Sequence, residues 1–202
     1  MQRFAIGFRD HTGWAAAVLL ERDAPVPKVR ASRRLSLCPD ELPREVYHAG
    51  SALDADAGKA LVSAVADTAR DMACVQVRGL LGEFGVAPGD ALGAIPVGSG
   101  RIPDSFAAIT RVHAMMHAAE GHLFREALAE ACIDAGLAVH RYPNKQLPDL
   151  AAGTIAMAPG GLAEALTAMG EGFGPPWTRD QKDAVVVAWL ALAARDGRLS
   201  AG

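Results

Sequence analysis

Residues 3–37, RFAIGFRDHTGWAAAVLLERDAPVPKVRASRRLSL, give the strongest indication of the fold class. This stretch contains three strand-like segments, residues 3–8, 14–21 and 28–37, separated by two polar turns. The second segment begins with a continuous apolar run, which is typical of a strand covered on both faces. The third mixes apolar and basic positions, as an edge strand does. We therefore expect the chain to begin with a meander of three antiparallel strands.

Helical and strand-like patterns alternate in the rest of the chain. The expected elements are a helix at about 54–84, a strand at 91–97, a helix at about 104–135, a strand at 137–142 and a helix at about 179–195. Two shorter helical segments lie between 145 and 170, split by proline and glycine at 159–161. The sequence therefore predicts an α/β fold, a five-stranded mixed sheet flanked by helices, in a single domain spanning 1–202.

The net charge and the cysteine pattern narrow the class of protein. The formal net charge of −3 at pH 7 disfavours nucleic acid as a partner, because the face that binds nucleic acid is usually strongly basic. Cys38, Cys74 and Cys132 form no CxxC pair and are typical of reduced, cytosolic cysteines. The longest apolar run, residues 184–194, is too short to span a bilayer. We expect a cytoplasmic protein without a membrane segment.

The start of the last helix carries two carboxylates on one face. Thr178 and Gln181 have the spacing of a capping box, which fixes the first turn. Asp180 and Asp183 are three residues apart in that turn, so together they could hold a divalent metal such as Mg²⁺ or Mn²⁺. Alternatively, acids in a first turn simply complement the helix dipole. Lys182 lies between them and is a weaker candidate for ligand binding.

The turn at residues 9–13, RDHTG, is the other polar cluster near a strand end. Asp10 and His11 are candidate catalytic residues there, although aspartate and glycine are also ordinary turn residues. Tyr47 and His48 would join this cluster if the irregular segment 38–51 folded over the end of the sheet.

Three residues of the second long helix could bind a transition metal. His113, His117 and Glu120 follow one stripe of the helix, so two imidazoles and a carboxylate could meet one ion. No glutamate follows His113 directly, so the general base of a zinc peptidase is missing. The alternative is that these histidines face solvent or an interface.

Two further segments could contact anions. Gly98, Ser99 and Arg101 belong to a glycine-rich loop that could cradle a phosphate or could simply be flexible. A basic cluster on the third strand could touch phosphates, or could protect an edge strand from aggregation. Its members are Lys28, Arg30, Arg33 and Arg34.

Two stretches resemble the Holliday-junction resolvase branch of the ribonuclease H-like superfamily. Residues 5–14, AIGFRDHTGW, resemble the opening strand of that branch. Residues 120–152 are similar to its pattern of a small-residue helix, a Gly-Leu-x-Val strand and a proline-ended turn. Asp183 and Ala184 resemble the start of its last helix. The resemblance implies a ribonuclease H-like five-stranded mixed sheet.

The same resemblance implies a set of catalytic acids that this chain matches only in part. Such resolvases have an aspartate inside the first strand, a glutamate at the end of the fourth strand and aspartates on the last helix. Here the first position is Phe8 or Arg9, Asp10 comes one step late, and residues 94–98 contain no acid. Only Asp180 and Asp183 match, and losing a carboxylate removes a ligand from a two-metal site.

These patterns lead to two main hypotheses about function. The first is a non-nuclease ribonuclease H-like domain with a binding, regulatory or assembly role. The alternative is a phosphodiesterase dependent on Mg²⁺ or Mn²⁺, with a displaced set of Asp10, Asp180 and Asp183 and with His11 or Glu120 assisting. A nucleotide-binding relative of the actin-like branch is a third reading, but residues 9–13 have only one of the glycines that its phosphate hairpin needs.

The arrangement of the site and of the last helix is also predicted. We expect residues 9–13, the strand end near Gly98 and the start of the last helix to converge, which would make Asp10, His11, Asp180 and Asp183 near neighbours. Residues 184–192 leave the last helix without a polar face, so it must be covered on more than one side. The second cover would be another helix or the partner subunit of a homodimer.

Overall fold

The computed structural model describes residues 2–155, 157–158 and 160–194. The strands are β1 (Phe4–His11), β2 (Trp14–Glu21), β3 (Lys28–Ser36), β4 (Ala91–Val97) and β5 (Ala138–Pro143). The helices are α1 (Val46–Ser51), α2 (Ala55–Glu83), α3 (Phe106–Thr110), α4 (His113–Asp134), α5 (Leu147–Thr154), α6 (Gly161–Glu171) and α7 (Arg179–Ala193), with a short 3₁₀ turn η1 (Asn144–Gln146) before α5. Two predicted boundaries lie outside the described residues: Pro159, in the predicted break between the two shorter helices, and Arg195, at the predicted end of the last helix.

The five strands form one mixed sheet in the order β3-β2-β1-β4-β5. β1 pairs antiparallel with β2, and β2 pairs antiparallel with β3, so the predicted meander is confirmed. β4 and β5 join in parallel on the other side of β1. Parallel neighbours need crossover connections, and the long helices between the strands supply them. The predicted fold class, an α/β protein with a five-stranded mixed sheet, is confirmed.

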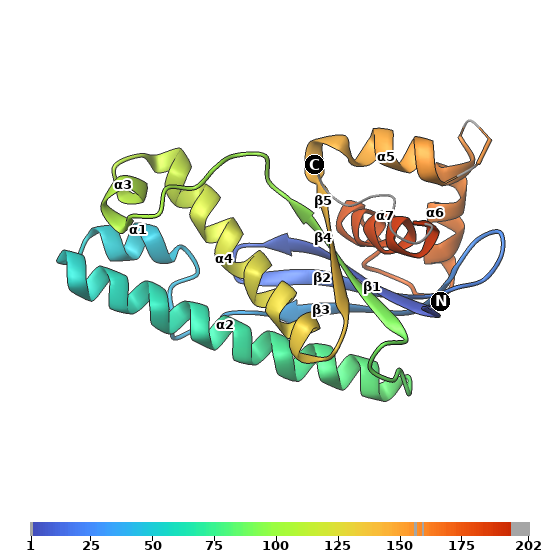
Figure 1. Ribbon diagram of the computed structural model, residues 1–202, viewed down its shortest axis with the longest axis horizontal. Helices are drawn as coiled ribbons and strands as arrows, with labels where there is room; N and C mark the ends of the chain where they lie inside the picture. Colours follow the sequence, from blue (N-terminus) through green and yellow to red (C-terminus); the bar gives the residue numbers. More distant parts are fainter. Residues whose placement is uncertain (1, 156, 159, 195–202) are drawn as a thin grey trace.

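Helices cover both faces of this sheet (Figure 1). α2 and α4 lie on one face and pack on the even-numbered residues of β1, among them Ile6 and Phe8. α5, α6 and α7 lie on the other face, where Ala5 is buried. A Cβ added to Gly7 would lie 2.0 Å from the carbonyl oxygen of Ala184, so the glycine is what lets α7 approach β1 so closely.

β1 extends three residues further than predicted. It runs to His11, which pairs with Trp14 across a turn of only two residues. Gly13 takes a φ of +81° in that turn, a conformation that glycine adopts without steric cost. The polar residues at 9–11 are therefore strand residues, and successive side chains point to opposite faces of the sheet.

The second long helix is interrupted, which corrects the prediction of one helix over 104–135. Val112 has extended backbone angles, φ −131° and ψ 112°, between α3 and α4. β-branched residues such as valine favour the extended region, and the break lets α4 begin at His113. Figure 1 shows α3 beside α1 at one end of the long helices, beyond the strands. α1 itself lies in the segment 38–51, which the sequence pattern had left irregular.

The last helix is covered within the chain. Its apolar residues pack on β1, β2 and β4 with one side and on the layer formed by α5 and α6 with the other. Trp189 is only 5% exposed. Helices of the same chain thus cover the side of α7 that faces away from the sheet, as expected. The apolar surface of α7 therefore does not require a dimer to bury it. No helix among the described residues combines the length and the apolar character needed to cross a membrane.

Candidate functional site

The end of β1 opens a polar pocket toward the end of β4. The β1–β4 ladder stops at Gly7 and Ala94, although both strands continue with their other neighbours. Pro96 has no N–H to donate at this point, which favours the separation of the two strands. A cavity of about 250 Å³ lies there. It is lined by residues 9–12 of the first hairpin, 96–98 after β4, Gly121 and Arg125 of α4, and Asn144.

Asp10 points toward α4 and is neutralised there by an arginine. Its carboxylate accepts a hydrogen bond of 3.1 Å from Nη1 of Arg125, and its side chain is only 7% exposed. Burial raises the pKa of Asp10 above its usual value, and the nearby charge of Arg125 opposes that rise. Asp10 is therefore half of a largely buried ion pair on the α4 face of the sheet.

Arg9 points to the opposite face and meets the last helix. Its Nε lies 3.7 Å from Oδ2 of Asp183, and its Nη1 donates to Oδ1 of Asn144 at 3.2 Å. Arg179, one turn earlier in α7, approaches the same Asp183 oxygen at 3.6 Å. Burial raises the pKa of Asp183, while the charges of Arg9 and then Arg179 act against the rise. The carboxylate thus lies between two guanidinium groups.

His11, two residues after Arg9, faces the same side and contacts the second carboxylate of α7. Its Nε2 is 3.0 Å from Oδ1 of Asp180. The imidazole of His11 stacks on the indole of Trp14, with ring centroids 4.2 Å apart. The guanidinium of Arg34 lies over the same indole, 3.5 Å from its centroid. These contacts fix the ring of His11 at the end of the central strand β1.

The first turn of α7 is placed by its cap. Thr178 accepts a hydrogen bond from the Asp180 backbone, and the reciprocal bond runs from the Thr178 backbone to the side chain of Gln181, so the predicted capping box is confirmed. This fixed turn directs Asp180 toward His11 and Asp183 toward Arg9. The start of α7 and the end of β1 are thus joined by two contacts, in each of which a carboxylate of the helix meets a basic side chain of the strand.

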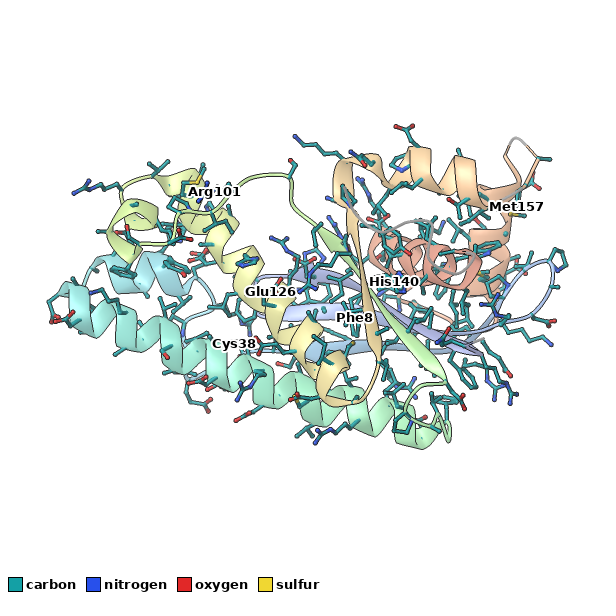
Figure 2. The ribbon with its side chains drawn as sticks, viewed as in Figure 1. Phe8, Cys38, Arg101, Glu126, His140 and Met157 are labelled. Atoms are coloured by element: carbon teal, nitrogen blue, oxygen red, sulfur yellow. The ribbon has the colours of Figure 1, made fainter. Side chains whose placement is uncertain are left out.

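The other predicted ligand residues are divided between this pocket and the surface. Gly98 lines the pocket, close to the guanidinium of Arg125. Ser99 and Arg101 are exposed and are not among its lining residues. Figure 2 shows Arg101 beside the beginning of α4, at the end of the molecule that holds α1 and α3. Lys182 is half-buried in α7 and does not line the pocket.

Tyr47 and His48 belong to a second cluster, apart from residues 9–13. The backbone N–H groups of both residues, and Nδ1 of His48, contact Oε1 of Glu120 at 2.9, 3.3 and 2.9 Å. His113 and His117 of α4 lie against the ring of His48. The sequence pattern had indicated His113, His117 and Glu120 as one stripe, but it gave no signal that His48 joins them, because 65 residues separate His48 from His113.

The basic cluster on β3 is engaged within the chain. β3 is an edge strand of the sheet, as its composition predicted. Three of the four basic side chains form ion pairs of 2.7–2.8 Å, and the fourth lies over an indole ring. The pairs are Lys28 with Asp23, Arg30 with Glu21, Arg33 with Glu83 and Arg34 with Trp14.

Comparison with known proteins identifies the fold. No protein-family model matches the sequence, and no curated protein matches it closely enough to count as a relative. RuvC of T. thermophilus in complex with a Holliday junction substrate has a TM-score of 0.57 and 13% sequence identity, covering 95% of this chain and 94% of RuvC. A Thermus thermophilus RuvC structure gives 0.53 at 13% identity, covering 93% and 91%. At such low identity the likeness shows the fold alone, which is ribonuclease H-like.

Proposed function

We propose that this chain is a ribonuclease H-like domain that does not cleave phosphodiesters and that acts by binding, in a regulatory or assembly role. One observation carries the proposal: arginines pair with two of the carboxylates on which a metal site would depend. Arg9 lies against Asp183, and Arg125 is hydrogen-bonded to Asp10. A guanidinium already supplies the positive charge that a divalent cation would otherwise bring to each carboxylate.

The strand position of Arg9 strengthens this proposal. Among the two residues that the resemblance aligns with the first-strand aspartate, Phe8 is buried in the core shared with α2 and α4. Arg9 faces α7 and its aspartates. Arg9 is therefore a cation at the position where an inner carboxylate would complete the set. β4 ends in Pro96 and Val97 and is followed by Gly98, so the end of this strand carries no acid. The donor set does not suit two hard cations, which prefer several oxygen ligands.

The displaced set of the alternative hypothesis is also divided in space. Asp10 and Asp183 take part in ion pairs that lie on opposite faces of the sheet. Glu120, the suggested assistant, accepts hydrogen bonds from residues 47 and 48 rather than lining the pocket. A magnesium-dependent phosphodiesterase would have to break both arginine pairs before these carboxylates could share an ion.

Branched DNA and a second copy of the chain are the partners to consider for this binding role. RuvC was solved with a Holliday junction substrate, so branched DNA is a reasonable ligand to test. The paired basic side chains of β3 and the net charge of −3 do not favour it. Self-association as a homodimer stays part of the proposal, since two-fold assembly is the commonest arrangement. A cytoplasmic location agrees with three free cysteines at positions 38, 74 and 132.

A cleavage assay tests this function directly. Labelled single-stranded, duplex and four-way-junction DNA are incubated with the chain and with Mg²⁺ or Mn²⁺, alongside an Asp183→Asn variant purified identically. We expect no cleavage above the level seen with the variant, because both preparations would carry the same traces of host nuclease. Metal-dependent cleavage by the native chain that disappears in Asp183→Asn would overturn the proposal and favour the displaced carboxylate set.

A further inference from the structure

Three imidazole rings from two helices meet at the end of the molecule that holds α1 and α3. His48 lies in α1, and His113 and His117 lie in the first two turns of α4. Nε2 of His48 is 3.2 Å from Nδ1 of His113, and Nε2 of His117 is 3.1 Å from Nε2 of His113. One nitrogen from each ring can be chosen so that all three lie within 4.8 Å of one another.

The spacing of these nitrogens suits a small transition-metal ion. Zinc binds imidazole nitrogen at about 2.0–2.1 Å, so the edge of a tetrahedral site is about 3.3 Å. The contact of 3.2 Å ends on Nδ1 of His113 and the contact of 3.1 Å on its Nε2, so either one can form an edge of the site. With one nitrogen taken from each ring, all three lie within 4.8 Å of one another, and small rotations of the exposed rings of His113 and His117 would bring them to that edge length. Imidazole ligands favour zinc and its neighbours in the first transition row over Mg²⁺ or Ca²⁺, which prefer oxygen.

The buried carboxylate of Glu120 is a second, independent indication. Its side chain is 0% exposed, and Oε1 accepts three donors from Tyr47 and His48. Oε2 is buried without a hydrogen-bond partner among the described residues, and the nearby Nδ1 of His117 is 3.6 Å away. A buried carboxylate charge is costly unless a positive charge lies close to it. A dication held by the rings would supply that charge.

Glu120 also fixes how His48 presents its ring. Because the carboxylate accepts the proton on Nδ1, a neutral His48 directs the lone pair of Nε2 toward His113 and His117. A carboxylate that orients a ligating histidine in this way is the usual outer partner of a metal site. His113 and His117 are exposed, so an ion can enter and a water can complete its coordination.

We propose that His48, His113 and His117 form a binding site for Zn²⁺ or a similar divalent transition metal, with Glu120 as its orienting carboxylate. The ion would join α1 to the start of α4 and stabilise the folded chain. The site shares no residue with the pocket between β1 and β4, so it does not depend on the function proposed above.

Zinc titration of the tag-free chain tests the site. The chain is first stripped with a chelator and then titrated with Zn²⁺ in competition with an indicator dye, and its melting temperature is recorded with and without Zn²⁺. We expect one ion per chain and a melting temperature that rises with Zn²⁺. His113→Ala and His117→Ala should bind at least about 100-fold more weakly, since loss of an outer-shell partner alone costs 10–100-fold.

His122→Ala is the matched control. His122 is an exposed histidine of the same helix, and its Nδ1 lies 3.8 Å from Oε1 of Glu126, away from the three rings. This variant should bind Zn²⁺ like the native chain. Equal melting temperatures of all variants in chelator would show that each is folded. Absence of stoichiometric binding to the native chain, or binding that survives in both His113→Ala and His117→Ala, would overturn the proposal.

Discussion

Nε of Arg9 and Oδ2 of Asp183 lie 3.7 Å apart, which places a strand guanidinium against the last helix at the end of the sheet. The side chains are 24% and 26% exposed, so solvent screens the pair only in part. The position of Arg9 follows directly from β1 continuing to His11, because this register directs Arg9 to the α7 face and Asp10 to the α4 face. Two adjacent residues thereby enter two separate ion pairs.

A double-mutant cycle with Arg9→Ala and Asp183→Ala should reveal this coupling. We expect an interaction energy of about 1 kcal/mol from urea unfolding at low salt, at the upper end of the range for exposed pairs. The comparison pair is Arg179 with Asp183, in which Arg179 is 89% exposed and for which we expect about 0.3–0.5 kcal/mol. A coupling indistinguishable from zero for Arg9 would show that its charge does not hold Asp183.

The close approach of α7 to β1 predicts a severe effect of Gly7→Ala. The added methyl group would lie 2.0 Å from the carbonyl oxygen of Ala184, and a backbone atom of a packed helix cannot move aside as a flexible side chain can. We expect a loss of about 3 kcal/mol or more in the free energy of unfolding. Gly79→Ala in α2 is the control, because nothing lies within 4 Å of its added Cβ. It should stabilise by up to about 1 kcal/mol.

The carboxylate of Glu120 should be essential for joining α1 to α4. Glu120→Ala would leave three donors on Tyr47 and His48 without their acceptor and would open a cavity. We expect a loss of about 2–5 kcal/mol in urea unfolding with chelator present, so that metal plays no part. Glu126→Ala, at a half-buried position of the same helix where the carboxylate pairs with Arg141, should cost no more than about 1 kcal/mol. Equal effects of the two variants would contradict this assignment.

The pKa of Asp183 predicts how stability changes with pH. Burial raises this pKa above 3.8 in the folded chain, so the folded state binds the proton more tightly than the unfolded state. The resulting contribution is full below 3.8 and is lost as the pH rises through the folded pKa. The free energy of unfolding of the native chain should therefore fall relative to that of Asp183→Asn as the pH rises from low to neutral. If the free energy of unfolding of the native chain rose relative to that of the variant over this range, the arginines would instead lower the pKa of Asp183 below its usual value.

The sequence predicted local features of the fold well, because short-range interactions determine them. Thr178 with Gln181 forms the capping box of α7 that their spacing predicted. Asp54 is a cap of the same local kind, because its side chain accepts from two backbone N–H groups at the start of α2. Both can be read from a few neighbouring residues. The order of strands and helices followed from the change in periodicity along the chain. The break at Val112 was missed because the residues around it are compatible with a continuous helix.

The candidate sites were less predictable because they depend on register and on distant contacts. The pattern at 9–13 indicated a turn, and only pairing with β2 shows that Asp10 faces Arg125 while His11 faces Asp180. His48 and His113 come together through the packing of α1 on α4, which leaves no periodic signal in the sequence.

Magnesium-dependent melting would detect a Mg²⁺ site at the end of the sheet. We expect none there, because Arg9 and Arg125 already pair with Asp183 and Asp10. Melting temperatures of the native chain and Asp183→Asn are measured across a Mg²⁺ series, with NaCl of matched ionic strength as the control. An ion that binds only the folded state would raise the melting temperature with its concentration. We expect the same profile for Mg²⁺ and for NaCl in both proteins. A rise specific to Mg²⁺ in the native chain that is lost in Asp183→Asn would contradict this expectation.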